Sequence, residues 1–96
     1  MELFVVIARD GSDAGALERR MAVREAHLAE ARRLKAAGHI LQAGAMLDDA
    51  QRMVGSVLLV AFDSRDTLND WLAADPYVMG NVWQDIEVKP FRLAPI

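Results

Sequence analysis

The residues best suited to chemistry in this sequence are a histidine and a distant aspartate, His27 and Asp75. Asp75 precedes Pro76, and a residue before proline is pushed out of the helical region, so the carboxylate has a defined place at a helix end. A carboxylate that accepts a hydrogen bond from one imidazole nitrogen leaves the other nitrogen free to move protons. Because an unperturbed histidine has a pKa of about 6.5, such a pair suits proton transfer near neutral pH.

The helix expected to carry His27 places other polar side chains beside it. Arg20, Arg24 and His27 fall on one stripe, and apolar residues flank this stripe on both sides, namely Leu17, Leu28, Ala31 and Leu34. Buried polar groups are costly unless they are hydrogen-bonded, paired or open to a cavity, so the stripe predicts a pocket. The alternative is structural: the arginines reach water past the sheet edge, His27 is a satisfied core histidine, and Asp75-Pro76 is ordinary turn chemistry.

The elements that must position these residues follow from hydrophobic periodicity and from helix-stop signals. Gly38 suits a helix C-terminus, Ser64 suits an N-cap, and Pro76 stops the helix before it. Irregular chain is expected around Gly80-Asn81. Leu17, Met21, Leu28, Ala31 and Leu34 are expected to face the core. The predicted elements are strands over Leu3–Ala8, Ile40–Met46, Val57–Phe62 and Trp83–Leu93, and helices over Ala14–Ala37 and Thr67–Ala74.

The order strand-helix-strand-strand-helix-strand divides into two β-α-β halves without a linker, so residues 1–96 are expected to form a single domain. Two right-handed crossovers place both helices on one face of a four-stranded antiparallel sheet. The sequence therefore predicts an α+β protein with the ferredoxin-like βαββαβ fold.

Two of the predicted strands carry continuous apolar runs, Phe4–Ile7 and Val57–Val60. Such runs are typical of strands that are covered on both faces, whereas two helices cover only one. A second copy of the same sheet is the simplest cover, since closed twofold assemblies are common. We therefore predict a homodimer through the open sheet face, with a higher oligomer left open.

Composition excludes several classes of function. The 96 residues carry a formal net charge of −3, which disfavours nucleic acid as a partner. No cysteine is present, so disulfides and thiolate metal sites are excluded, and a reducing compartment is compatible. Asp48-Asp49 lacks a histidine or a third carboxylate in register, so no metal site is predicted there, and no cofactor is predicted. The short apolar N-terminal run suits neither a signal peptide nor a membrane span, and we predict a cytoplasmic protein.

Several short motifs occur in an order that resembles the YciI-like (YCII-related) family. Arg24-Glu25-Ala26-His27-Leu28 is similar to that family's R-x-x-H-L segment. The other matching pieces are Ala43-Gly44 with Met46, Gly55-Ser56, Phe62 to Ser64, Trp71, Asp75-Pro76-Tyr77 and Val88-Lys89-Pro90-Phe91. The ordered set covers nearly the whole chain.

The resemblance implies the dimeric α+β barrel form of the ferredoxin-like fold, related to muconolactone isomerase and to cofactor-independent monooxygenases of small aromatic compounds. Members of the family are proposed to carry a His-Asp pair in a pocket, which implies that role for His27 and Asp75. A dehydrochlorinase of a chlorinated hydroquinone is a relative of the family.

Together, these observations predict acid–base chemistry on a small cyclic or aromatic molecule, of the isomerase, lyase or dehydrochlorinase type. His27 would be the general acid and base, and Asp75 would orient it. Arg24 is a candidate to bind a substrate anion, and Ser56 and Tyr77 are candidates to hydrogen-bond the substrate. The alternatives are a non-catalytic small-molecule-binding or regulatory module and a cofactor-independent monooxygenase.

Overall fold

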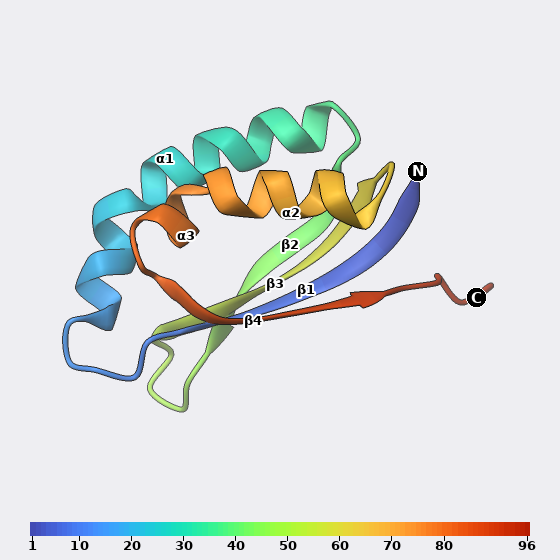
Figure 1. The fold of residues 1–96 in the computed structure, drawn as a ribbon. Helices are drawn as coiled ribbons and strands as arrows, with labels where there is room; N and C mark the ends of the chain where they lie inside the picture. The colour runs from blue at the N-terminus through green and yellow to red at the C-terminus, as the bar shows by residue number, and fades with distance from the viewer.

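The computed structural model describes residues 1–96 as a sheet with helices packed against one of its faces (Figure 1). No helix in it is both long enough and apolar enough to cross a membrane. The elements along the chain are β1 (Glu2–Asp10), α1 (Ala16–Ala36), β2 (Ile40–Leu47), β3 (Met53–Phe62), α2 (Arg65–Ala74), α3 (Pro76–Met79) and β4 (Trp83–Pro90).

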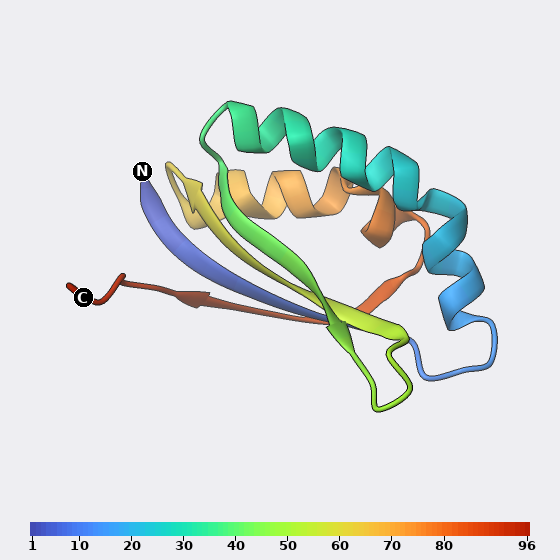
Figure 2. The same cartoon turned by 180° about the vertical axis from the view of Figure 1, so that it is seen from behind.

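The four strands are antiparallel and lie in the order β2-β3-β1-β4. All three helices cover the same face, and the view from behind shows the opposite face bare (Figure 2). This confirms the predicted ferredoxin-like α+β fold. The core lies between sheet and helices, with Val6, Val60, Leu68, Tyr77 and Val82 among its most buried members.

The stripe of α1 that faces the sheet differs from the one expected from its leucines. Leu17 and Met21 are 37% and 51% exposed, so their predicted place in the core is wrong. Leu34 is buried as predicted, and Arg20 and His27, which were predicted to lie on the stripe between the apolar residues, are buried too. The physical reason is that apolar residues are spread around this helix, and the side chains that line up at sheet-facing spacing include two polar ones. The most buried stripe of α1 is therefore partly a polar one, which must be satisfied by hydrogen bonds or by a cavity.

Helix ends mostly follow the predicted signals. Gly38 has φ of 85°, and the amides of Gly38 and His39 donate to the carbonyls of Lys35 and Leu34, as in a Schellman motif. The Ser64 hydroxyl accepts a hydrogen bond from the Thr67 amide at the start of α2. These caps fix where each helix meets the sheet.

The irregular chain expected around Gly80-Asn81 is present as a turn, but the short helix α3 over Pro76–Met79, which was not predicted, precedes it. Asp75 ends α2 in an extended conformation and serves at the same time as the N-cap of α3. Proline blocks the continuation of α2, yet it is favoured in the first turn of a new helix. One residue therefore stops one helix and starts the next.

Strand β4 contains a bulge that decides which side chains enter the core. Arg9 pairs with Asp85 and Asp10 pairs with Trp83, so Gln84 is an extra residue in β4. The bulge turns Trp83 to the helix side of the sheet, where Asp10 also points. β4 ends at Pro90, earlier than predicted, and β3 begins at Met53, earlier than predicted.

The face opposite the helices carries apolar side chains that remain partly accessible, which we call the open sheet face. Along β1 the fully buried residues alternate with half-buried ones, as expected of a strand covered on one side. The open sheet face comprises Leu3, Val5, Ile7, Val57 and Leu59, of which Val57 is 38% exposed.

Candidate functional site

His27 and Asp75 meet between α1 and the α2–α3 junction. The imidazole Nδ1 lies 2.9 Å from Asp75 Oδ1, and both side chains are almost wholly buried. Asp75 Oδ1 also accepts a hydrogen bond from the Tyr77 amide at 2.8 Å. The cap of α3 therefore holds the carboxylate in the position from which it reaches the histidine.

The hydrogen-bond partners assign the tautomer of His27. An ionised carboxylate only accepts hydrogen bonds, so Nδ1 of His27 is the nitrogen that donates. Nε2 makes no hydrogen bond within the protein. In the neutral imidazole, Nε2 is consequently the basic nitrogen, and its orientation is fixed by Asp75.

Aromatic rings hold the imidazole in place. The His27 ring stacks on the Tyr77 ring with centroids 3.8 Å apart and planes 14° from parallel. Trp83 meets the same imidazole edge-on at 5.4 Å. Ring contacts together with the Asp75 hydrogen bond leave His27 little rotational freedom.

A cavity of about 260 Å³ adjoins this pair, and we call it the His27 cavity. Small residues of β2 leave the space open, because Ala43, Gly44 and Ala45 fill little volume beneath α1. Seven of its lining residues are apolar, so the polar groups are few and localised. The residues around it are Arg20, Arg24, His27, Leu28, Ala31, Ala43, Gly44, Ala45, Met53, Ser56, Leu58 and Tyr77.

All five candidate site residues lie in or beside this cavity. Arg24, Ser56 and Tyr77 line it together with His27. Asp75 does not line the cavity, but it accepts a hydrogen bond from His27. Arg24 is half-buried and makes no ion pair. Its guanidinium is therefore an uncompensated positive charge at the cavity.

Sequence reasoning missed a buried ion pair on the cavity wall. Arg20 Nη1 lies 3.0 Å from both carboxylate oxygens of Asp10, and Arg20 Nη2 donates to Ser56 Oγ at 2.9 Å. The Arg20 guanidinium also lies 4.7 Å from the centroid of the Tyr77 ring. A core-facing arginine requires a counter-ion, and that requirement was the available signal for Asp10.

His39, the second histidine of the chain, follows the end of α1. It is half-buried, its Nδ1 lies 2.8 Å from the Ala61 carbonyl, and its ring stacks on Phe62. Phe62 stacks in turn on Trp71, which is a core residue. His39 is thus a structural histidine, and it does not line the His27 cavity.

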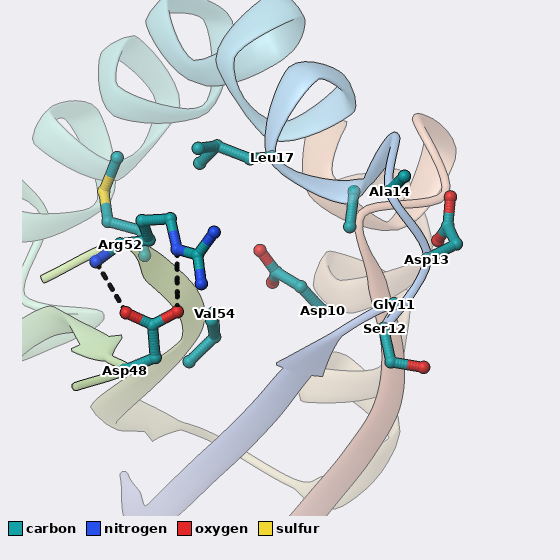
Figure 3. A pocket seen from close by; sticks show the side chains of 11 residues that line it. Asp10, Gly11, Ser12, Asp13, Ala14, Leu17, Asp48, Arg52 and Val54 are labelled. Carbon is teal, nitrogen blue, oxygen red and sulfur yellow. Dashed lines mark hydrogen bonds and ion pairs between the residues drawn. The ribbon is translucent and has the colours of Figure 1, made fainter. Parts of the chain in front are cut away.

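A second cavity, of about 370 Å³, lies between the β1–α1 loop and the β2–β3 turn (Figure 3). Its charged groups are already paired: Arg52 bonds Asp48, Arg19 bonds Asp13, and Asp10 bonds Arg20. The Arg19 guanidinium holds the pKa of the Asp13 carboxyl well below its usual range. The pairing leaves little there to recognise a ligand.

Tyr77 is the only tyrosine, so its ionisation can be followed alone. Burial raises the pKa of its phenol above the ordinary value near 10, and the positive charges of Arg20 and Arg24 oppose this only in part. We expect tyrosinate absorbance of the native protein to develop at higher pH than that of the protein in denaturant. An ultraviolet titration near 295 nm measures both curves.

The raised pKa of Tyr77 also makes the stability of the protein depend on pH. The unfolded chain loses the Tyr77 proton first, so this contribution to stability is complete below pH 10 and is lost as the pH rises through the folded pKa. Coincident native and denatured titration curves would contradict the buried placement of this phenol.

Comparison with known proteins places the chain in a family. Residues 2–92 match the YCII-related domain. Protein YciI of Escherichia coli O6:H1 is 38% identical over 96 residues, covering 94% of this chain and 96% of that protein. An uncharacterised protein of Haemophilus influenzae is 38% identical over 95 residues, covering 93% and 95%.

Two solved structures are similar to this one. The 5-chloro-2-hydroxyhydroquinone dehydrochlorinase TftG of Burkholderia phenoliruptrix AC1100, in complex with 2,5-dihydroxybenzoquinone, superposes with a TM-score of 0.83 at 27% identity, covering 96% of this chain and 95% of TftG. Protein Atu4242 of Agrobacterium tumefaciens, with a TM-score of 0.54 and 20% identity over 99% and 95% of the chains, shares the fold. The family match and the YciI identity show that this chain belongs to the YCII-related domain family.

Proposed function

We propose that this protein is an acid–base enzyme that moves protons on a small cyclic or aromatic molecule, with His27 as the acid and base and Asp75 as its orienting partner. The observation that carries the proposal is the buried 2.9 Å contact between His27 Nδ1 and Asp75 Oδ1 beside a cavity. A fixed tautomer with an unbonded Nε2 is what general acid–base catalysis requires.

The size and polarity of the cavity support a single substituted ring as the substrate. An apolar cavity of about 150 Å³ holds benzene, so about 260 Å³ accommodates a ring with several substituents. The mostly apolar wall suits the ring, and the few polar groups suit its oxygens.

Charge favours an anionic substrate. Asp10 compensates Arg20, and Asp75 partners His27, whereas Arg24 has no acidic partner. The cavity therefore has a positive charge to offer to a phenolate, an enolate or a carboxylate.

The similarity to TftG narrows the chemistry. TftG is a dehydrochlorinase of a hydroxylated hydroquinone, and its complex holds a dihydroxybenzoquinone. Removal of a proton beside a carbon that bears chloride lets the chloride leave with the bonding electron pair. The same base that performs tautomerisation thus also supports elimination, and we propose a hydroxylated cyclic substrate for this chain.

Hydrogen exchange tests the proposal without knowledge of the natural substrate. In D₂O, His27 with a deuteron on Nε2 gives that deuteron to the ring carbon next to a phenolate carbon, whose oxygen becomes a carbonyl. The original proton of that carbon is then lost from the opposite face, either to solvent or to the base after the ligand has rebound through its other face, and the phenolate returns. We expect the protein to accelerate loss of ring-hydrogen signals from 1,2,4-trihydroxybenzene or 2,5-dihydroxybenzoquinone in proton NMR. A panel of cyclic enols and phenols that exchanges no faster than in buffer would overturn the proposal.

We further propose that two copies associate through the open sheet face. Its central positions are apolar and remain partly accessible. Charged residues mark its edge, namely Asp85, Glu87 and Lys89 on β4 and Arg9 at the end of β1. A bare apolar sheet face on a small domain is typical of a protein interface.

Replacing Leu59 with aspartate is expected to convert the dimer into a monomer, because the substitution places a charge at the centre of the apolar face. Sedimentation velocity at micromolar concentration measures the change. Ala29→Asp, on the exposed side of α1, is the matched control and should leave the dimer intact. A wild-type protein that sediments as a monomer would contradict this interface.

A further inference from the structure

The hydroxyl group of Ser56 has an unusual set of partners. Ser56 is 4% exposed, and its Oγ accepts hydrogen bonds from Arg20 Nη2 at 2.9 Å and from Trp83 Nε1 at 3.2 Å. A guanidinium and an indole N–H have no acceptor capacity, so both contacts are donations to the serine oxygen.

The two contacts limit the hydrogen bonds that the Ser56 hydroxyl can still form. A hydroxyl oxygen has two lone pairs and one proton. Arg20 and Trp83 occupy both lone pairs, and no protein group accepts the proton. Because Ser56 lines the His27 cavity, that proton is directed to whatever oxygen the cavity holds. The serine can donate to a ligand, but it cannot accept from one.

The partners of Ser56 are themselves fixed. Asp10 holds the Arg20 guanidinium through both of its carboxylate oxygens. The bulge at Gln84 turns Trp83 inward. A hydrogen bond from a hydroxyl that is itself polarised by a guanidinium is strengthened, and it favours an acceptor that carries negative charge.

We propose that Arg20 and Trp83 fix the Ser56 hydroxyl as a one-way hydrogen-bond donor, so that the His27 cavity selects ligands that present an anionic oxygen of the phenolate or enolate class. Ser56 contacts the ligand, whereas Arg20, Asp10 and Trp83 are positioning residues. This inference rests on the proposed function for its substrate class. It adds the group that stabilises the charge left on oxygen when His27 moves the proton on carbon.

A chromogenic phenol tests the inference by binding alone. The neutral and anionic forms of 4-nitrophenol absorb at different wavelengths, so its ionisation on the protein can be read directly. We expect the bound phenol to ionise at lower pH than the free phenol. Ser56→Ala should weaken phenolate binding about ten- to hundredfold, as expected for loss of a hydrogen bond to a charged group. Ser56→Thr keeps the hydroxyl and should restore most of the affinity.

Two further variants test whether Arg20 and Trp83 force the Ser56 hydroxyl to donate to the ligand, or whether Ser56 merely contacts it. Trp83→Phe frees one lone pair of a retained Ser56, and Asp10→Leu with Arg20→Met frees the other. Each should reduce the ionisation shift of the bound phenol without removing the serine. 4-Nitroanisole, which lacks the ionisable hydroxyl, is the ligand control, and its affinity should be the same in wild type and Ser56→Ala.

Some results of these binding experiments would overturn the inference, and others would affect only the proposed enzymatic function. Equal phenolate affinity of wild type and Ser56→Ala, equal losses for phenolate and anisole, or no phenolate binding by wild type would each overturn the inference. Selective phenolate binding without hydrogen exchange would leave it intact and remove only the enzymatic function. Circular dichroism of each variant confirms that the comparison is between folded proteins.

Discussion

His27→Asn is expected to lower the rate of ring-hydrogen exchange about 10²–10⁴-fold, the usual contribution of a positioned general acid or base. The asparagine amide nitrogen can occupy the place of Nδ1 and still donate to Asp75, which accepts at 2.9 Å in the wild type. What disappears is Nε2, the nitrogen without a partner in the protein. The substitution therefore removes the base and retains the hydrogen bond that supports the fold.

His39 provides a matched control, because the chain contains only two histidines. His39→Asn removes an imidazole that interacts with the Ala61 carbonyl and stacks on Phe62, away from the His27 cavity. We expect the exchange rate of this variant to stay close to that of the wild type. Proton NMR in D₂O at matched concentrations of folded protein measures all three.

The same experiment separates the competing functions. Retained exchange in His27→Asn, or equal losses in both histidine variants, would contradict a catalytic His27. Phenolate binding without exchange in the wild type would leave a small-molecule-binding or regulatory module. Substrate loss that requires dioxygen would move the assignment to a cofactor-independent monooxygenase.

The sequence carried enough information for the fold and for the central pair because both depend on local patterns. Strand and helix periodicities fixed the element order, and the topology of two equivalent halves placed His27 near Asp75. The prediction that a helix ends at Asp75-Pro76 was also correct, since α2 ends at Ala74. The same two residues are a typical helix start, an aspartate N-cap followed by proline, and that second reading would have found α3.

The polar network on the cavity wall was not predictable in the same way, because it depends on pairing between strands. Asp10 and Trp83 enter the core together through a bulge at Gln84, and nothing local marks that register shift. Arg20 was correctly placed on the buried stripe, but its partner lies on another element. Leu17 and Met21 were misplaced because their apolar character outweighed the spacing that puts Arg20 and His27 against the sheet.

Asp10→Leu is expected to lower the stability of the protein strongly. The side chains of Asp10 and Arg20 are 2% and 4% exposed, so Asp10→Leu leaves a guanidinium buried without its counter-ion. Breaking a buried ion pair by removing one partner typically costs about 3–5 kcal/mol, against a total of about 5–15 kcal/mol for a native domain. We expect the melting temperature to fall by roughly 12 °C or more, since each kcal/mol corresponds to about 4–8 °C in a domain of this size. Thermal unfolding followed by circular dichroism measures it.

Two variants show whether burial is the cause. Asp13→Leu breaks the neighbouring pair with Arg19, whose contacts of 2.8 and 2.7 Å are shorter than those of Asp10 but whose side chains are far more accessible, at 55% for Asp13 and 30% for Arg19. Water solvates the freed Arg19, so little change in melting temperature is expected. Asp10→Leu combined with Arg20→Met should recover most of the lost stability, because replacing both partners of a buried pair by apolar groups is often neutral. A double variant as unstable as Asp10→Leu alone would mean that the unpaired charge is not the cause. The double variant could instead recover its stability and show a smaller ionisation shift of the bound phenol. That result would mean that the Asp10–Arg20 pair serves ligand binding, because apolar packing at the same site would stabilise the fold equally well.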